Sequence, residues 1–130
     1  MPPRVGGLLL PAGLACLFFA TVAGGQTVWY VDLANCPGPG SGTEADPFCT
    51  IQAAIDAAAG DASPADEIIV ADGVYTGAGN KDLDFGGKTL KLRSANGPAS
   101  CIIDCEGEGR GFYFHSGETA EAEVDGFTVR

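Results

Sequence analysis

Residues 67–114 decide the fold, and they read EIIVADGVYTGAGNKDLDFGGKTLKLRSANGPASCIIDCEGEGRGFYF. Within this stretch, pairs of apolar residues separated by one residue recur at a constant interval, at Ile68 and Val70, Leu90 and Leu92, and Phe112 and Phe114. Each pair points two side chains to the same face of a strand. A strand that returns after about 20 residues predicts coils stacked on one another. We therefore expect the first members of the three pairs to stack in one inward column and the second members in another.

A second apolar series supports the same architecture. Leu83, Ile103 and Val124 recur at nearly equal intervals, each within a short run suited to a strand. Two interleaved series with nearly the same period predict an all-β, right-handed parallel β-helix of about two and a half coils, with at least two sheet faces. A sandwich of antiparallel hairpins would also give short strands, but it does not require so constant a period.

Patterning and turn residues predict one helix and several short strands. The helix covers 51–59, with Thr50 suited to an N-cap and Gly60 to the stop. It has one apolar stripe and precedes the first coil, so we expect it to cap the exposed end of the stack. The predicted strands are 27–31, 67–71, 74–75, 83–85, 89–93, 101–104, 111–115 and 121–129.

Composition and charge exclude some classes of partner. The chain has 130 residues, which suits one domain, and its 20 glycines and eight prolines indicate many sharp turns. Its formal net charge is -10. So acidic a surface repels phosphate backbones, and we therefore expect no nucleic acid partner and no binding to an anionic membrane.

The segment 1–25 is typical of a secretory signal peptide. Arg4 is followed by an almost wholly apolar run over 8–23, and then by the small residues Gly24 and Gly25. A transmembrane anchor and a lipoprotein acylated at Cys16 are the alternatives. The run is shorter than the roughly 20 residues that span a bilayer, and the context of Cys16 is poor for acylation. We expect a protein secreted or held in the cell envelope, with no membrane span after removal of 1–25.

Four further cysteines agree with export. An even number of cysteines in an exported chain favours disulfides. Cys36 with Cys49 would close a loop rich in proline and glycine. Cys101 with Cys105 is left open, because a straight strand would hold their Cα atoms about 13 Å apart, and a bond therefore requires a bend. A zinc site is disfavoured, because His115 is the only histidine and the chain contains no Cys-x-x-Cys.

Three phrases of the sequence resemble one family of repeat proteins. WYVD at 29–32 and DPFCTIQAAI at 46–55 resemble the amino-terminal cap of exported bacterial right-handed parallel β-helix proteins, the pectin-lyase-like group. IIVADGVY at 68–75 resembles the first coil of that group, and VDGFTV at 124–129 resembles a phrase of its later coils. The resemblance covers nearly all of 27–130.

The resemblance implies an organisation and two kinds of function. It implies an amino-terminal cap over 26–66 and β-helix coils over 67–130, which we expect to continue in downstream coils of the same protein. The group includes polysaccharide lyases, hydrolases and non-catalytic surface proteins. We expect a non-catalytic scaffold for carbohydrate or cell-surface interaction. The alternative is the front end of a polysaccharide lyase or glycoside hydrolase with its active groove on later coils.

Few residues suggest chemistry, and we assign no catalytic residue. Asp82 and Asp84 flank Leu83, and on a strand the two carboxylates would share a face, which makes them weak calcium candidates. Two solvent-facing acids are the more frequent outcome. Arg110 suits a pair with Glu108 or Asp104.

Two kinds of ring side chain complete the candidates. His115 suits a turn, because no acid lies close to it in sequence. Aromatic side chains could stack on sugar rings if exposed, although packing is the more frequent role. They are Trp29, Tyr30, Tyr75 and Tyr113.

Overall fold

The computed structural model describes residues 26–130. The predicted signal peptide and Cys16 lie outside the described residues. Nine strands form three sheets, and every strand pair within them is parallel. The elements are β1 (Val28–Val31), a 3-10 turn η3 (Leu33–Asn35), α1 (Ile51–Ala57), β2 (Asp66–Val70), β3 (Gly73–Tyr75), β4 (Leu83–Asp84), β5 (Leu90–Ser94), β6 (Cys101–Ile103), β7 (Phe112–Tyr113), β8 (Glu123–Asp125) and β9 (Thr128–Val129).

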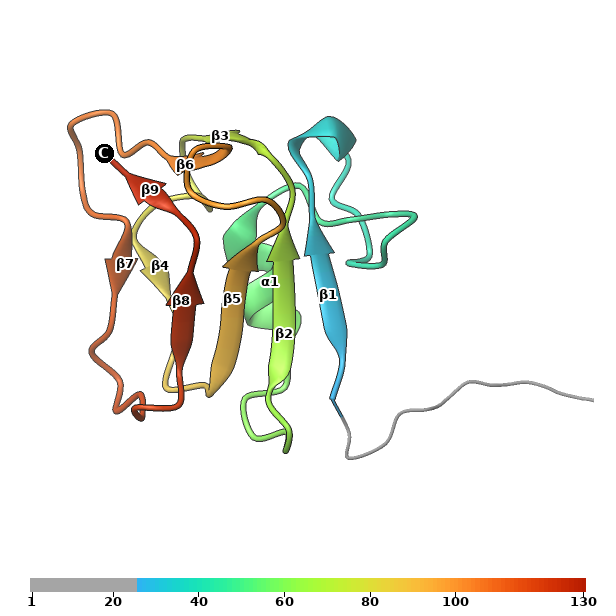
Figure 1. Ribbon diagram of the computed structural model, residues 1–130, viewed down its shortest axis with the longest axis vertical. Coiled ribbons are helices and arrows are strands. Elements are labelled where there is room, and N and C mark those ends of the chain that lie inside the picture. Colours follow the sequence, from blue (N-terminus) through green and yellow to red (C-terminus); the bar gives the residue numbers. More distant parts are fainter. Residues whose placement is uncertain (1–25) are drawn as a thin grey trace, which may run out of the picture.

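The chain visits the sheets in a repeating order. One sheet has the order β1-β2-β5-β8, the second β3-β6-β9 and the third β4-β7. From β2 onward the chain therefore passes through the first, second and third sheets twice, and then through the first and second again. Figure 1 shows β1, β2, β5 and β8 side by side and pointing the same way. The expected parallel direction is confirmed, and a sandwich of antiparallel hairpins is excluded for these strands.

The predicted columns have the wrong register. Ile68 lies opposite Leu92 in place of Leu90, and Leu92 lies opposite Val124 in place of Phe114. Leu90 is fully buried but lies opposite Asp66, and Phe112 belongs to a different sheet, where it pairs with Leu83. The second series is also wrong, because its three members lie on three different sheets.

The register error has a physical cause. The inward row of β2 is Asp66, Ile68 and Val70, and the inward row of β5 is Leu90, Leu92 and Ser94. Each row carries one buried polar residue at an end, Asp66 in β2 and Ser94 in β5. An apolar-pair pattern omits both, so it aligns the two strands two residues out of register.

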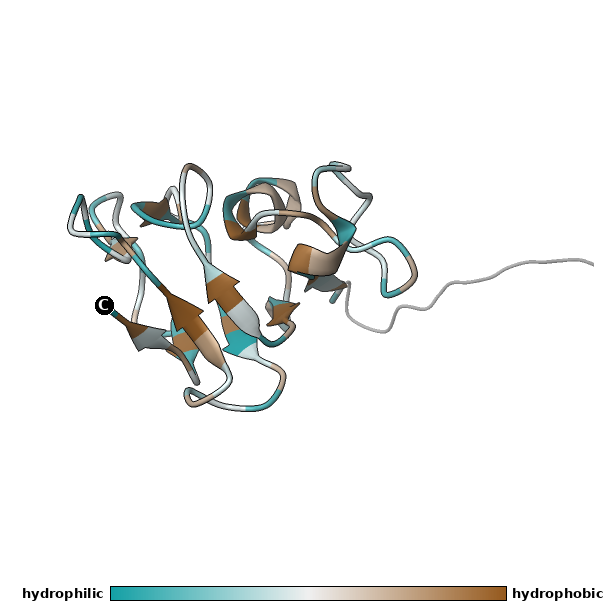
Figure 2. Cartoon of the chain, turned by 90° about the horizontal axis from the view of Figure 1, so that it is seen from above, coloured by the Kyte–Doolittle hydropathy of each residue, from teal (hydrophilic) through white to brown (hydrophobic). Residues whose placement is uncertain are grey.

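Helix α1 covers one end of the stack. Ile51, Ala54 and Ile55 are buried, and the helix packs against β1, β2 and β4. The predicted N-cap is confirmed, since the Thr50 hydroxyl accepts a hydrogen bond from the amide of Ala53. The helix ends two residues earlier than predicted. Figure 2 shows hydrophobic residues on the helix and on the strands of the sheets.

A lysine from the turn after β4 caps the carboxyl terminus of α1. The Lys88 ammonium donates to the carbonyls of Ile55, Asp56 and Ala58, each at 2.9 Å. A cation at a helix carboxyl terminus satisfies carbonyls that have no partner in the helix and interacts favourably with the helix dipole. The carboxyl end of α1 is thereby joined to the turn that follows β4.

A disulfide-closed loop covers the outer edge of β1. Cys36 and Cys49 form the expected disulfide, with Cα atoms 5.0 Å apart. Between them the loop exchanges backbone hydrogen bonds with Tyr30, which donates to Gly42 and accepts from Phe48. Trp29 stacks on Phe48, with ring centroids 5.9 Å apart. The loop therefore acts as a neighbour for a strand edge that would otherwise be open.

The other two cysteines within residues 26–130, Cys101 and Cys105, are free and buried. Cys101 begins β6, and burial raises the pKa of its thiol to about 11. The structure thus has no bond between Cys101 and Cys105, the pairing that the sequence left open.

The sequence predicted a single strand over 121–129, whereas the structure has two strands in this segment, β8 and β9. The segment 121–129 bends at Gly126, which has a φ of +86°, and this bend separates β8 from β9. A Cβ at this position would lie 2.4 Å from the Ser94 hydroxyl oxygen of the preceding coil. A side chain here would have to displace the Ser94 hydroxyl, and the positive φ also favours glycine.

Asp66 joins β2 to the segments on either side of α1. Its side chain is buried, and its carboxylate accepts three hydrogen bonds, from the Thr27 amide at 2.9 Å, the Trp29 indole at 3.1 Å and the Ala59 amide at 3.0 Å. These donors belong to the start of the chain's first strand and to the segment just after α1. One carboxylate therefore fixes β1, β2 and the end of the helix relative to one another.

We predict that Asp66→Ala lowers the free energy of unfolding by about 2–3 kcal/mol, because it removes the acceptor of three partly buried donors. Asp66→Asn keeps one acceptor oxygen and should lose about half as much. Chemical denaturation with the disulfide intact measures both. Asp61→Ala is the matched control, since Asp61 is an exposed acid of the same turn. A loss at Asp66 no larger than the loss at Asp61 would contradict this role.

Candidate functional site

The outward face of the β4–β7 sheet carries a group of exposed polar and aromatic side chains that contact one another. Leu83 and Phe112 pair across the two strands and point inward, whereas Asp84 and Tyr113 pair and point outward. Residues just before and after the strands extend this group. We call it the β4–β7 face, and its members are Asp82, Asp84, Arg110, Tyr113 and His115.

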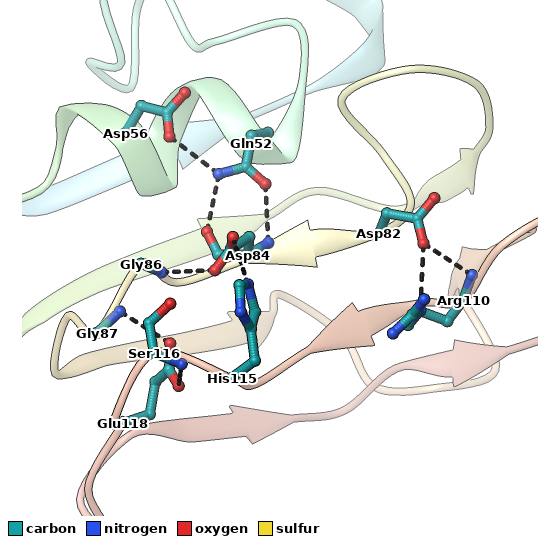
Figure 3. Close-up of polar contacts among 10 residues, drawn as sticks. All are labelled: Gln52, Asp56, Asp82, Asp84, Gly86, Gly87, Arg110, His115, Ser116 and Glu118. Atoms are coloured by element: carbon teal, nitrogen blue, oxygen red, sulfur yellow. Dashed lines mark hydrogen bonds and ion pairs between the residues drawn. The ribbon is translucent and has the colours of Figure 1, made fainter.

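Asp84 and His115 form a hydrogen-bonded pair on this face. The His115 Nε2 lies 3.0 Å from the Asp84 Oδ2, and both side chains are 40% exposed. The other carboxylate oxygen of Asp84 accepts from the Gly86 amide at 2.8 Å (Figure 3). The hydrogen bond with His115, followed by that with Gly86, holds the pKa of Asp84 below its ordinary value. The sequence contains no local sign of this partner, because Asp84 and His115 are 31 residues apart and meet only through the pairing of β4 with β7.

Helix α1 holds Asp84 from the other side. The Gln52 amide accepts from the Asp84 backbone amide at 3.0 Å and donates to the Asp84 carbonyl at 2.9 Å. Its nitrogen also donates to Asp56 one helical turn away. Gln52 therefore takes the place of a neighbouring strand at the edge of β4, opposite β7 (Figure 3).

Tyr113 is enclosed by two planar groups. The His115 ring stacks on it with centroids 3.8 Å apart, and the Arg110 guanidinium lies 4.1 Å from its centroid. Arg110 precedes the strand and His115 follows it, and Figure 3 shows them at opposite ends of β7. Stacking of a sugar on the Tyr113 ring, one of the sequence expectations, would therefore have to compete with the His115 ring and the Arg110 guanidinium.

Asp82 lies apart from Asp84. It has a φ of +49° and precedes β4, so the expectation that the two acids share one face of a strand is wrong. Asp82 accepts from the Arg110 amide at 3.1 Å and lies 3.5 Å from the Arg110 Nε. Arg110 thus pairs with Asp82, whereas the sequence suggested Glu108 or Asp104. Those two acids pair with Lys81 and Arg130.

The structure adds no further ligands to the predicted calcium site at Asp82 and Asp84. Among residues 26–130, no group of three or more His, Cys, Asp or Glu side chains is placed to hold a metal ion. Asp82 and Asp84 each have a basic partner of their own. Calcium binding by these two residues stays a prediction.

Glu118 fixes the turn that carries His115. Its carboxylate accepts from the Gly87 amide at 2.8 Å and from the Ser116 amide at 3.0 Å, and these bonds lower its pKa. The sequence pattern identified neither Glu118 nor Gln52 as a site residue. A glutamate two residues beyond a serine in a turn is a local signal for the Ser116 contact, but nothing local indicates Gly87.

The remaining aromatic candidates are mostly structural. Tyr75 is fully buried and its hydroxyl donates to the Ala71 carbonyl. Trp29 packs on the disulfide-closed loop through Phe48.

No helix within the described part of the chain has the length and apolar character needed to cross a membrane.

We predict that His115→Ala raises the pKa of Asp84 toward its ordinary value, because the largest cause of the depression is removed. Carboxyl ¹³C NMR titration measures this directly. The Asp84–His115 pair contributes stability above the ordinary aspartate pKa and loses it as the pH falls through the lowered value.

Asp104 provides the matched control for this titration. Its pKa is also lowered, by the Glu106 amide and then by Arg130, so it should stay unchanged in His115→Ala. Conversely, Arg130→Ala should raise the pKa of Asp104 and leave that of Asp84 where it was. An unmoved Asp84 in His115→Ala would show that the pair does not form.

Compared with known proteins, the chain matches no family model, no curated protein and no solved structure. The resemblance to the pectin-lyase-like group therefore stays a prediction from the sequence phrases.

Proposed function

We propose that this chain is the capped front part of an exported right-handed parallel β-helix and serves as a scaffold for carbohydrate or cell-surface interaction, without catalysis of its own. The observation that carries the proposal is the repeated passage of the chain through three parallel sheets in one order. A chain that winds in this way presents flat, regularly spaced outward faces, which suit extended polymers better than small ligands.

The β4–β7 face is the part of this scaffold best suited to contact a glycan. It offers exposed carboxylate, imidazole, guanidinium and phenol groups, which can donate to and accept from sugar hydroxyls. Arg110 already has an acidic partner in Asp82, and His115 is hydrogen-bonded to Asp84. Because the chain also carries a net charge of -10, we propose neutral glycans before polyuronides.

The secreted or envelope location belongs to the same proposal. It is supported by the signal-like sequence of 1–25 and by the disulfide between Cys36 and Cys49, since such bonds persist in oxidising compartments. It predicts that the exported protein begins near Gln26.

One contact favours the alternative, the front end of a polysaccharide lyase or glycoside hydrolase. The Asp84 carboxylate orients His115 at 3.0 Å on an exposed face, which is the geometry of a base held by an acid. The groove would then lie on further coils, and His115 would stand at its margin.

We predict that neutral oligosaccharides such as xylohexaose or cellohexaose shift the NMR signals of Asp84, Tyr113 and His115 at millimolar concentration, and that oligogalacturonate shifts them less. His115→Ala should weaken the neutral-sugar response at least threefold, because it removes a hydrogen-bonding group from the face.

Arg130→Ala is the control, because it also removes the basic partner of an aspartate, the half-buried Asp104, beside another sheet. Equal losses in both variants would contradict a glycan site on the β4–β7 face. Release of uronides from pectin or alginate by this chain, with or without calcium, would overturn the non-catalytic proposal, and its loss in His115→Ala would support the enzyme alternative.

A further inference from the structure

A hollow of about 280 Å³ lies on the outward face of the first sheet, beside the disulfide-closed loop. Tyr30 of β1 and Ile69 of β2 are outward neighbours in the ladder, and Ala71 and Ala95 directly follow β2 and β5. The small alanine side chains leave room beyond Tyr30 and Ile69. Pro47 of the loop, which lies beside β1 in Figure 1, lines the hollow as well. The floor of the hollow is therefore largely apolar.

Two carboxylates line this hollow without a basic partner. Asp32 follows β1, and Glu44 comes from the disulfide-closed loop. Within residues 26–130, neither side chain takes part in an ion pair. One carboxylate oxygen of Asp32 accepts from the Ala34 amide at 2.9 Å, which leaves the other oxygen for a ligand. Arg93 of β5, the base of the same outward row, is already paired with Glu67. The hollow therefore presents negative charge beside an apolar floor.

An extended peptide has little to bind at this hollow. The backbone of β1 is already paired on this side, since Tyr30 donates to Gly42 and accepts from Phe48 of the loop. The loop thus takes the place that an added strand would need. At about 280 Å³ the hollow is also at the small end of ligand pockets, which suits a single ring better than a longer segment.

We infer that this hollow binds one sugar ring of a glycan whose sugars carry free amino groups. The apolar face of the ring would pack on Tyr30 and Ile69, and its ammonium and hydroxyl groups would donate to Asp32 and Glu44. A neutral sugar lacks the positive charge, and a uronide would add a third carboxylate to the two already present. The hollow lies on the first sheet, so this site is separate from the proposed glycan site on the β4–β7 face.

Three trisaccharides of equal length test the site by NMR titration of the full exported chain. They are the β-1,4-linked trimers of glucosamine, N-acetylglucosamine and glucose, used in low salt at about pH 6, where carboxylates are ionised and a sugar amine is charged. We expect the glucosamine trimer to bind about tenfold more tightly than the other two, because only its ammonium groups can pair with the two acids. The shifted signals should be those of Tyr30, Ile69 and Ala71, and added salt should reduce the preference.

Paired substitutions separate this site from general attraction to an acidic protein. Asp32→Asn with Glu44→Gln should reduce the tenfold preference to about onefold, and an asparagine side chain can still accept from the Ala34 amide. Asp61→Asn with Glu106→Gln changes the net charge equally at exposed positions that do not line the hollow, and this pair should keep the preference. Unchanged amide signals of β5 and β8 check that each variant is folded.

Three results would overturn the inference. They are equal affinity for the glucosamine and glucose trimers, shifts confined to the β4–β7 face, and equal loss of preference in the two variant pairs. Acetyl-lysine methylamide that binds as tightly as the glucosamine trimer would also overturn it, since it would assign the hollow to lysine side chains of a protein. Selective shifts at Tyr30 and Ile69, with no response of the β4–β7 face to neutral oligosaccharides, would support this site and contradict the earlier glycan proposal alone.

Discussion

The backbone ladder between parallel strands is the constraint on which the rest of this structure depends. Each strand needs a hydrogen-bonded neighbour on both sides, or some other group in its place, because unpaired strand edges are costly when buried and prone to aggregation when exposed. Near α1 the substitutes are a disulfide-closed loop beside β1 and the Gln52 amide beside β4. Helix α1, capped by Thr50 and closed by Lys88, keeps Gln52 in place.

The sequence predicts the elements and the strand direction because both follow from local patterns. Alternating apolar residues mark the strands, Thr50 marks the helix start, and the loop between Cys36 and Cys49 is closed as expected. Register is different, because it depends on which residues of two separate strands are both buried. Asp66 and Ser94 are buried and make hydrogen bonds in the folded chain, and the pattern of apolar residues does not indicate those bonds. The apolar pattern alone therefore misaligns β2 and β5.

The site is less predictable than the fold, since its contacts join neighbouring parallel strands that are separated in sequence by segments of unequal length. Asp84 meets His115 across 31 residues, and Arg110 meets Asp82 across 28. The chain from Leu92 to its partner Val124 is also longer than the chain from Ile68 to its partner Leu92. With intervals that vary in this way, no fixed period can indicate which acid faces which base. The sequence therefore indicates which of these residues are polar and exposed, but not which partner each one meets.

The most direct test of this account is the pattern of nuclear Overhauser effects between backbone protons of β2, β5 and β8. The structure predicts contacts that join Ile68 to Leu92 and Leu92 to Val124 in a parallel arrangement. Contacts that join Ile68 to Leu90 and Leu90 to Phe112, or the close α-proton pairs of antiparallel strands, would contradict it.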